Sequence, residues 1–165
     1  MGESAPLPGE TKLWRRFLRN SEGGAAVEFA LILNILFLMI LGMLEFGLAF
    51  SYRQVIINAS REGAQYGIAY KVDPQGNQVP PVNLGPSINN WVLNPDSGGL
   101  GLRSILPANS YPQVTVAGAG ATSGLTGDNL IVTITCEYPF WVMNKLLPLL
   151  DYKMPLMGKT VMRVE

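Results

Sequence analysis

A run of apolar residues near the N-terminus constrains the fold more than any other feature of the sequence. From Phe29 to Leu44, Asn34 is the one polar side chain in sixteen residues, and after Glu45 the apolar character resumes to Phe50. As a helix, these 22 residues would extend about 33 Å at a rise of ~1.5 Å per residue. The hydrocarbon core of a bilayer is roughly 30 Å thick, so the run predicts a transmembrane helix.

The positions of the prolines predict that this helix continues beyond the apolar run. All twelve prolines lie outside residues 9–73, and ten of them occur from Pro74 onward. Proline lacks a backbone N–H and interrupts helices, so the proline-free stretch favours one continuous helix from about Ser21 to Tyr70.

Two other interpretations of the apolar run fit the sequence less well. The apolar part of a secretory signal peptide is roughly 7 to 15 residues long and precedes a small-residue cleavage site. This run is longer, and residues 49–51 make a poor site of that kind. A helix buried in a soluble core would be amphipathic, whereas ten of the twelve residues 35–46 are large hydrophobics. Membrane insertion is therefore favoured.

Basic residues ahead of the run predict its orientation. Lys12, Arg15, Arg16 and Arg19 lie within the first 23 residues. Positive charge flanking a span tends to stay in the cytoplasm, so we expect a single-pass protein with a cytoplasmic N-terminus and an extracytoplasmic C-terminal part.

The junction between this basic leader and the apolar run carries a candidate processing site. Gly23 and Gly24 are followed by Glu28 and the aromatic Phe29. Small side chains would let an extended backbone enter a protease at the membrane surface. The pattern resembles the type IV prepilin site of the tight-adherence class, and this resemblance implies cleavage between Gly23 and Gly24.

The resemblance extends over three ordered motifs, at residues 24–31, 44–47 and 58–66, about 43 residues or a quarter of the chain. Together they resemble the TadE-like family of minor pseudopilins. That resemblance implies a minor pseudopilin of a tight-adherence (Flp-type, type IVc) pilus, a system related to type II secretion, in the bacterial inner membrane. The partners implied are the major pilin, other minor pseudopilins, a prepilin peptidase, the inner-membrane assembly platform and membrane lipid.

The same resemblance gives Glu28 an assembly role. Cleavage would leave Gly24 as a new amino terminus four residues from Glu28. Burying an unpaired charge in a low-dielectric helix bundle is costly, so the amine and carboxylate of adjacent subunits could neutralise each other. Glu28 would then set the register between subunits.

Two further polar residues interrupt the apolar run. Asn34 and Glu45 are eleven residues apart, which at about 100° per residue brings them within roughly 20° of one another on the helix. One interpretation is a contact stripe for a neighbouring helix. In the other, Glu45 lies hydrated at the outer membrane interface.

Small residues after the span predict a packing groove on the stalk part of the helix. Gly63 and Gly67 are four residues apart and would permit close approach of another element. That element could be the chain's own sheet or another pilin, and the sequence leaves both open. Arg61 and Glu62 are adjacent, point in different directions, and are expected to be solvated.

The C-terminal part is expected to be a small α+β head. A short helix is predicted over residues 87–93 with Ser87 as its cap, and a Gly-rich hairpin loop over residues 118–127. Alternating apolar residues predict antiparallel strands at 113–117, 130–138 and 159–164. The predicted organisation is a leader at 1–23, a transmembrane and stalk helix at 24–70, and a head at 71–165.

Composition argues against most chemistry in this head. Histidine is absent and Cys136 is the single cysteine, which excludes an imidazole base, a His or Cys metal cluster and an internal disulfide. Cys136 falls on the apolar side of a strand and is expected in the core. Asp73, Asp96, Asp128 and Asp151 occur in turn-like contexts. We predict neither enzyme activity nor a cofactor.

Charge and architecture leave two functional hypotheses. Twelve basic residues balance twelve acidic ones, so no charge excess indicates nucleic-acid binding. The favoured hypothesis is a cleaved minor pseudopilin that initiates, assembles or regulates a pilus. The alternative is an uncleaved, membrane-anchored extracytoplasmic binding module.

Overall fold

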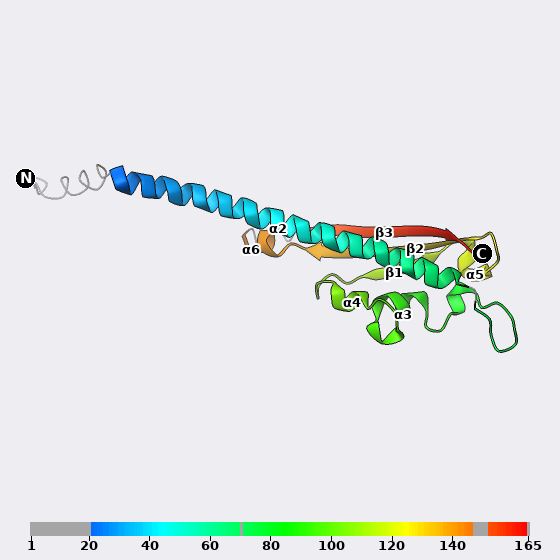
Figure 1. The fold of residues 1–165 in the computed structure, drawn as a ribbon. Helices are drawn as coiled ribbons and strands as arrows, with labels where there is room; N and C mark the ends of the chain where they lie inside the picture. The colour runs from blue at the N-terminus through cyan, green and yellow to red at the C-terminus, as the bar shows by residue number, and fades with distance from the viewer. Residues whose placement is uncertain (1–20, 70, 147–151, 165) are drawn as a thin grey trace, which may run out of the picture. The chain divides into compact units, whose positions relative to one another are not determined.

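The computed structural model describes residues 21–69, 71–146 and 152–164 (Figure 1). Most of the predicted leader, including its four basic residues, lies outside the described residues, as do Tyr70 and Asp151. The elements in chain order are α2 (Ser21–Ile68), η1 (Pro81–Asn83), α3 (Ile88–Leu93), η2 (Pro95–Ser97), α4 (Leu102–Ile105), β1 (Gln113–Ala117), α5 (Ala119–Ser123), β2 (Asn129–Pro139), α6 (Trp141–Leu146) and β3 (Lys153–Arg163).

Helix α2 is the dominant element, at 48 residues. The prediction of one uninterrupted helix is confirmed. The chain divides into two units, Met1–Met43 and Leu44–Glu165, and α2 contributes to both.

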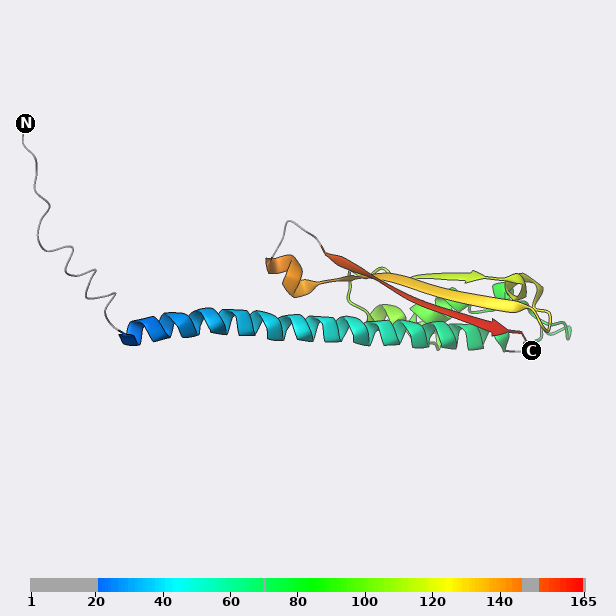
Figure 2. The same cartoon turned by 90° about the horizontal axis from the view of Figure 1, so that it is seen from above.

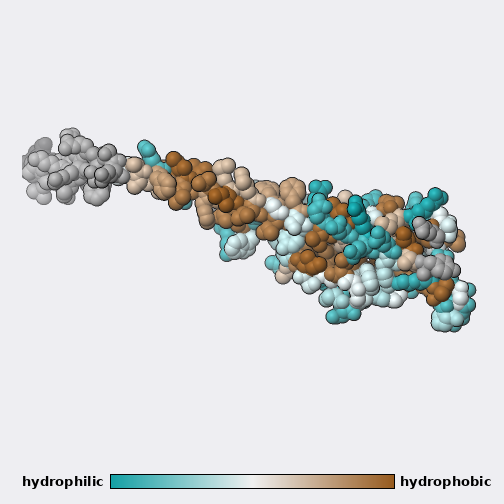
Figure 3. Space-filling model, viewed as in Figure 1, coloured by the Kyte–Doolittle hydropathy of each residue, from teal (hydrophilic) through white to brown (hydrophobic). Residues whose placement is uncertain are grey.

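The described part of the first unit is the N-terminal half of α2. Its large apolar side chains from Val27 to Met43, apart from the half-buried Leu41, are between 47% and 68% exposed, and they give this half of the helix a mainly hydrophobic surface (Figure 3). Among the described residues, one helix is long and apolar enough to cross a membrane, and it includes this segment. The expected apolar N-terminal helix is therefore confirmed.

The second unit is built on a three-stranded antiparallel sheet in the order β1-β2-β3. The register pairs Gln113 with Thr135 in β1 and β2, and Asn129 with Arg163 in β2 and β3. The predicted α+β class is confirmed, and β1 has the predicted bounds. The central strand exceeds the prediction by one residue at each end.

The third strand begins at Lys153, six residues before the predicted start at Lys159. Pro155 favoured a break at that point. The prediction of the start is wrong because β3 is an edge strand, and an edge strand tolerates a residue that cannot donate a ladder hydrogen bond.

One face of the sheet forms the core with the second half of α2 and with α3. Leu130, Val132, Ile134 and Cys136 of β2 are buried, as their alternation predicts. They belong to one cluster with Ile56 and Ala59 of α2, and with Ile88 and Val92 of α3. Figures 1 and 2 both show the strands alongside this half of α2.

Local signals account for some of the short helices. Ser87 caps α3 as predicted, its hydroxyl accepting the Asn90 N–H at 3.3 Å. The predicted hairpin loop at 118–127 does connect β1 to β2, but it contains the short helix α5. Gly118 begins this connection at a φ of 97°, and a Cβ there would lie 2.2 Å from the Asn129 carbonyl oxygen, so glycine is required.

A glycine also sets the distance between β3 and α2. An added Cβ at Gly158 would lie 2.7 Å from the backbone oxygen of Ile56 and 3.0 Å from the Cα of Ile57. These are backbone atoms of a helix, so they cannot rotate away as a side chain could. The sheet approaches α2 this closely because position 158 has no side chain.

We expect Gly158→Ala to lower the free energy of unfolding of the second unit by about 1–3 kcal/mol, the usual cost of overpacking. The control is Gly47→Ala, since an added Cβ at Gly47 meets no atom within 4 Å. Alanine there should be neutral or stabilising by up to ~1 kcal/mol, because it favours the helix. Urea titration of the full chain in detergent micelles, followed by tryptophan fluorescence, measures both. Equal midpoints for the two variants would contradict the close approach.

Candidate functional site: processing segment and helix contact residues

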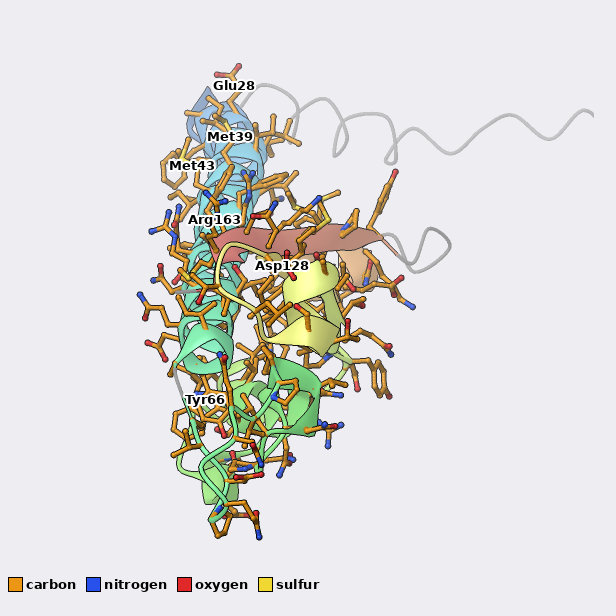
Figure 4. All side chains as sticks on the ribbon, turned by 90° about the vertical axis from the view of Figure 1, so that its right-hand side faces the viewer. Glu28, Met39, Met43, Tyr66, Asp128 and Arg163 are labelled. Atoms are coloured by element: carbon orange, nitrogen blue, oxygen red, sulfur yellow. The ribbon has the colours of Figure 1, made fainter. Side chains whose placement is uncertain are left out.

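The candidate processing residues lie at the start of α2, in the first unit. Gly23 and Gly24 are exposed, and a Cβ added at either would meet no atom within 4 Å. Glu28 and Phe29 follow on the same helix, both exposed, and Figure 4 shows the Glu28 side chain directed away from the helix. Gly24 and Glu28 are four residues apart, about one helical turn, so they lie on the same side of the helix.

The two polar residues of the predicted stripe have different environments. Asn34 is exposed in the first unit. Glu45, in the second unit, is only 4% exposed. The hydrated alternative for Glu45 is therefore wrong in this structure, because water has little access to its carboxylate.

The Glu45 carboxylate binds the first turn of α6. Its Oε1 accepts the Val142 N–H at 2.8 Å, and its Oε2 accepts the Met143 N–H at 3.3 Å. The first N–H groups of a helix have no partner within the helix, and the helix dipole favours a negative group there. Glu45 thus has a partner in its own chain, and its burial is compensated by two hydrogen bonds.

Aromatic rings surround this contact. Phe46 and Phe140 pack edge to face with ring centroids 5.5 Å apart, and Tyr138 contacts both Phe140 and Tyr52. Burial raises the pKa of Tyr138, and the nearby Glu45 carboxylate and Tyr52 raise it further. No local sequence signal predicts this cluster, because two of its rings come from α2 and the other two from the distant C-terminal end of β2.

Gly63 and Gly67 lie against the chain's own head. An added Cβ at Gly63 would lie 2.8 Å from Val92 Cγ2, and one at Gly67 would lie 2.5 Å from Leu130 Cδ2. Of the two elements left open by the sequence, the structure places the chain's own sheet and α3 at these glycines. Next to them, Tyr66 (labelled in Figure 4) stacks on Trp91 with ring centroids 4.3 Å apart.

A polar contact accompanies these glycines on the same side of α2. The hydroxyl groups of Ser60 and Thr160 lie 2.7 Å apart, and Ser60 is fully buried. Arg61 and Glu62, on the other side of α2, are exposed as expected. In this part of α2, buried small residues thus lie on one side of the helix and exposed charged residues on another.

The acidic residues of the head have local roles. Asp73 accepts the backbone N–H of Asn77 at 2.8 Å, and this bond and others within its turn lower the pKa of Asp73. Asp96 lies in η2, and Asp128, beside α5 in Figure 4, accepts the Ser123 hydroxyl at 2.6 Å. The turn interpretation is confirmed for Asp73 and Asp128, whereas Asp96 lies in a short 3-10 helix. Within the described ranges, no group of three His, Cys, Asp or Glu residues could hold a metal ion.

Cys136 is a core residue, as predicted. Its side chain is 5% exposed, and burial raises the pKa of the thiol to about 11. Very little thiolate is present at neutral pH with such a pKa, so this cysteine is a packing residue.

Comparison with known proteins identifies the N-terminal segment. Residues 23–65 match the family model described as TadE-like protein. The TadE-like match confirms the resemblance. It contains the first two motifs, the third motif except its last residue, Tyr66, and every candidate site residue except Gly67. The TadE-like family implies a function related to the Tad pilus and points to pilin partners. No curated protein and no solved structure matches the chain.

We expect Glu45→Ala to lower the free energy of unfolding of the second unit by about 1–3 kcal/mol, because two partly buried N–H groups lose their acceptor. Glu45→Gln retains one acceptor oxygen and should lose less. The measurement is urea unfolding of the full chain in detergent, with Glu62→Ala, an exposed position on the same helix, as the control. Unchanged stability of Glu45→Ala together with weaker binding to pilins would instead assign Glu45 to an intermolecular contact.

Proposed function

We propose that the protein is a minor pseudopilin of a tight-adherence pilus, with a structural rather than a catalytic role. In this proposal it is held in the bacterial inner membrane by the first half of α2, with an extracytoplasmic head, and it acts in initiating, assembling or regulating the pilus. The observation that carries the proposal is the TadE-like match over residues 23–65, which includes the half of α2 whose large apolar side chains are mostly exposed.

Cleavage between Gly23 and Gly24 is part of the proposal. A peptidase needs an extended backbone, and each glycine in a helix is about 1 kcal/mol less favourable than alanine. Two glycines in the first turn of α2 therefore favour local unwinding at this bond. The open surroundings of both glycines also support access by a peptidase.

Glu28 is proposed to set the register between subunits after cleavage. The new amine of Gly24 would lie one turn from the Glu28 carboxylate. The exposed apolar surface around Glu28 needs lipid or neighbouring helices to cover it, and both have a low dielectric. An unpaired carboxylate is costly in such surroundings, which favours pairing with the amine of an adjacent subunit.

We expect Gly23→Leu to block processing, because a large side chain would hinder entry of the backbone into the peptidase. The matched control is Gly42→Leu, since Gly42 lies on the same helix and an added Cβ there also meets no atom within 4 Å. Mass spectrometry of the mature chain should find Gly24 as the first residue in the native protein and in the control. A native chain that begins at Met1 or Gly2 would contradict cleavage and favour the uncleaved membrane-anchored binding module.

We expect Glu28→Leu to leave membrane insertion intact but to reduce recovery of pilus components with the protein at least about tenfold, the effect of ~1.4 kcal/mol. The lost interaction is the pairing of the carboxylate with a neighbouring amine. The measurement is co-purification from membranes with Glu62→Leu as the control, because Glu62 is exposed on the second half of α2. Equal recovery with both variants would remove Glu28 from the assembly mechanism.

A further inference from the structure

Helix α6 exposes an aromatic and basic surface. Trp141 is 68% exposed, and the Lys145 Nζ lies 4.5 Å from the centroid of the Trp141 ring. Beside them is an open hollow of about 600 Å³ lined by aromatic rings, proline and asparagine residues and two lysines. A tryptophan this exposed on a head with a well-packed core needs a physical reason, because a large ring is usually buried.

The place of α6 along the chain supplies that reason. Glu45 binds the first turn of α6, and it lies near the outer end of the apolar run, which continues to Phe50. The 22 residues from Phe29 to Phe50 would extend about 33 Å as a helix, close to the ~30 Å of a hydrocarbon core. If they span the bilayer, its outer boundary falls near Phe50, about 7.5 Å of helix beyond Glu45, and α6 then lies at the outer edge of the hydrocarbon core, next to the lipid headgroups.

The chemistry of this surface suits that level. Tryptophan is enriched at membrane interfaces because its ring is apolar and its N–H is polar. A lysine near an anionic membrane surface is attracted to it. Lys145 provides positive charge at this surface. Among the described residues nearby, Glu137 pairs with Lys153 at 3.7 Å, and Glu45 accepts two backbone N–H groups.

We propose that Trp141 and Lys145 of α6 bind the headgroups of anionic phospholipids in the membrane that α2 crosses. We call this contact between α6 and lipid the seat of the head. This inference rests on the membrane anchoring in the proposed function. The seat fixes the depth of the head relative to the bilayer. It also gives the head a contact with lipid that must be released before the protein can leave the membrane.

Tryptophan quenching in lipid nanodiscs tests the seat. Trp14→Phe is introduced into the full chain, which leaves Trp91 and Trp141 as its tryptophans. The fluorescence of Trp141 is then obtained by subtracting the fluorescence of a chain that also carries Trp141→Phe. Lipids brominated near the top of the acyl chains are the quencher. Trp91 is an internal reference, because it stacks on Tyr66, 21 residues or about 31 Å of helix beyond Glu45.

We expect Trp141 to be quenched several-fold more than Trp91 in discs that contain anionic lipid and hold one chain each. Lys145→Gln should reduce this quenching in anionic discs, whereas Lys159→Gln, an exposed lysine on β3, should not. Similar effects of the two lysine variants would contradict the role of Lys145.

Three results separate the possible failures. A chain that does not enter the discs would overturn membrane anchoring and the proposed function with it. A chain that enters, but whose Trp141 is quenched no more than Trp91, would overturn the seat alone. Quenching of Trp141 that changes with the number of chains per disc would show that a second copy, and not lipid, covers α6.

Discussion

Close packing between the second half of α2 and the sheet determines the structure of the head. The contact is possible because α2 presents small residues at helical spacing, while β2 presents large ones opposite them. At Gly158 of β3, the absence of a side chain lets the strand approach the backbone of α2. Small residues on one partner and branched residues on the other give the interdigitated packing of a protein interior. The residues of α2 that are buried on this side are small except for Ile56: Ala49, Ile56, Ala59, Ser60, Gly63, Ala64 and Gly67.

Glu45 lies close to the point where the surface of α2 changes. Up to Phe50, apolar residues are exposed on the helix, as lipid or other helices require. From Ser51 onward, one side of the helix is buried and its exposed residues are mainly polar. The cost of burying the Glu45 carboxylate is compensated by hydrogen bonds from two N–H groups of α6. These N–H groups lie in the first turn of α6 and have no partner within that helix. The same contact holds α6 close to the first residues of the second unit.

The elements with local sequence signals were predictable, and the contacts between distant segments were not. The absence of proline predicted α2, and period-two alternation predicted β1 and β2. The start of β3 was missed because Pro155 acts as a strand breaker except at a sheet edge, and edge position depends on the whole topology. The partner of Glu45 is 97 residues away, and no periodicity or motif connects Glu45 to Val142. Gly63 and Gly67 predicted a close approach without identifying the approaching element.

The TadE-like segment has two parts, of which the second packs within the chain and the first is exposed. The motifs at 44–47 and 58–66 have their buried residues engaged within the chain, Glu45 with α6, and Gly63 with α3 and the sheet. Their side chains support the fold of the head. The motif at 24–31 lies in the first unit, where Glu28 and the large apolar side chains are exposed. A side chain that is satisfied within its own chain gains little from a neighbouring subunit, whereas an exposed carboxylate among exposed apolar residues needs one in a membrane. In the proposed pseudopilin, assembly contacts of the helix would therefore come from its first half, where Glu28 and Asn34 are exposed polar groups.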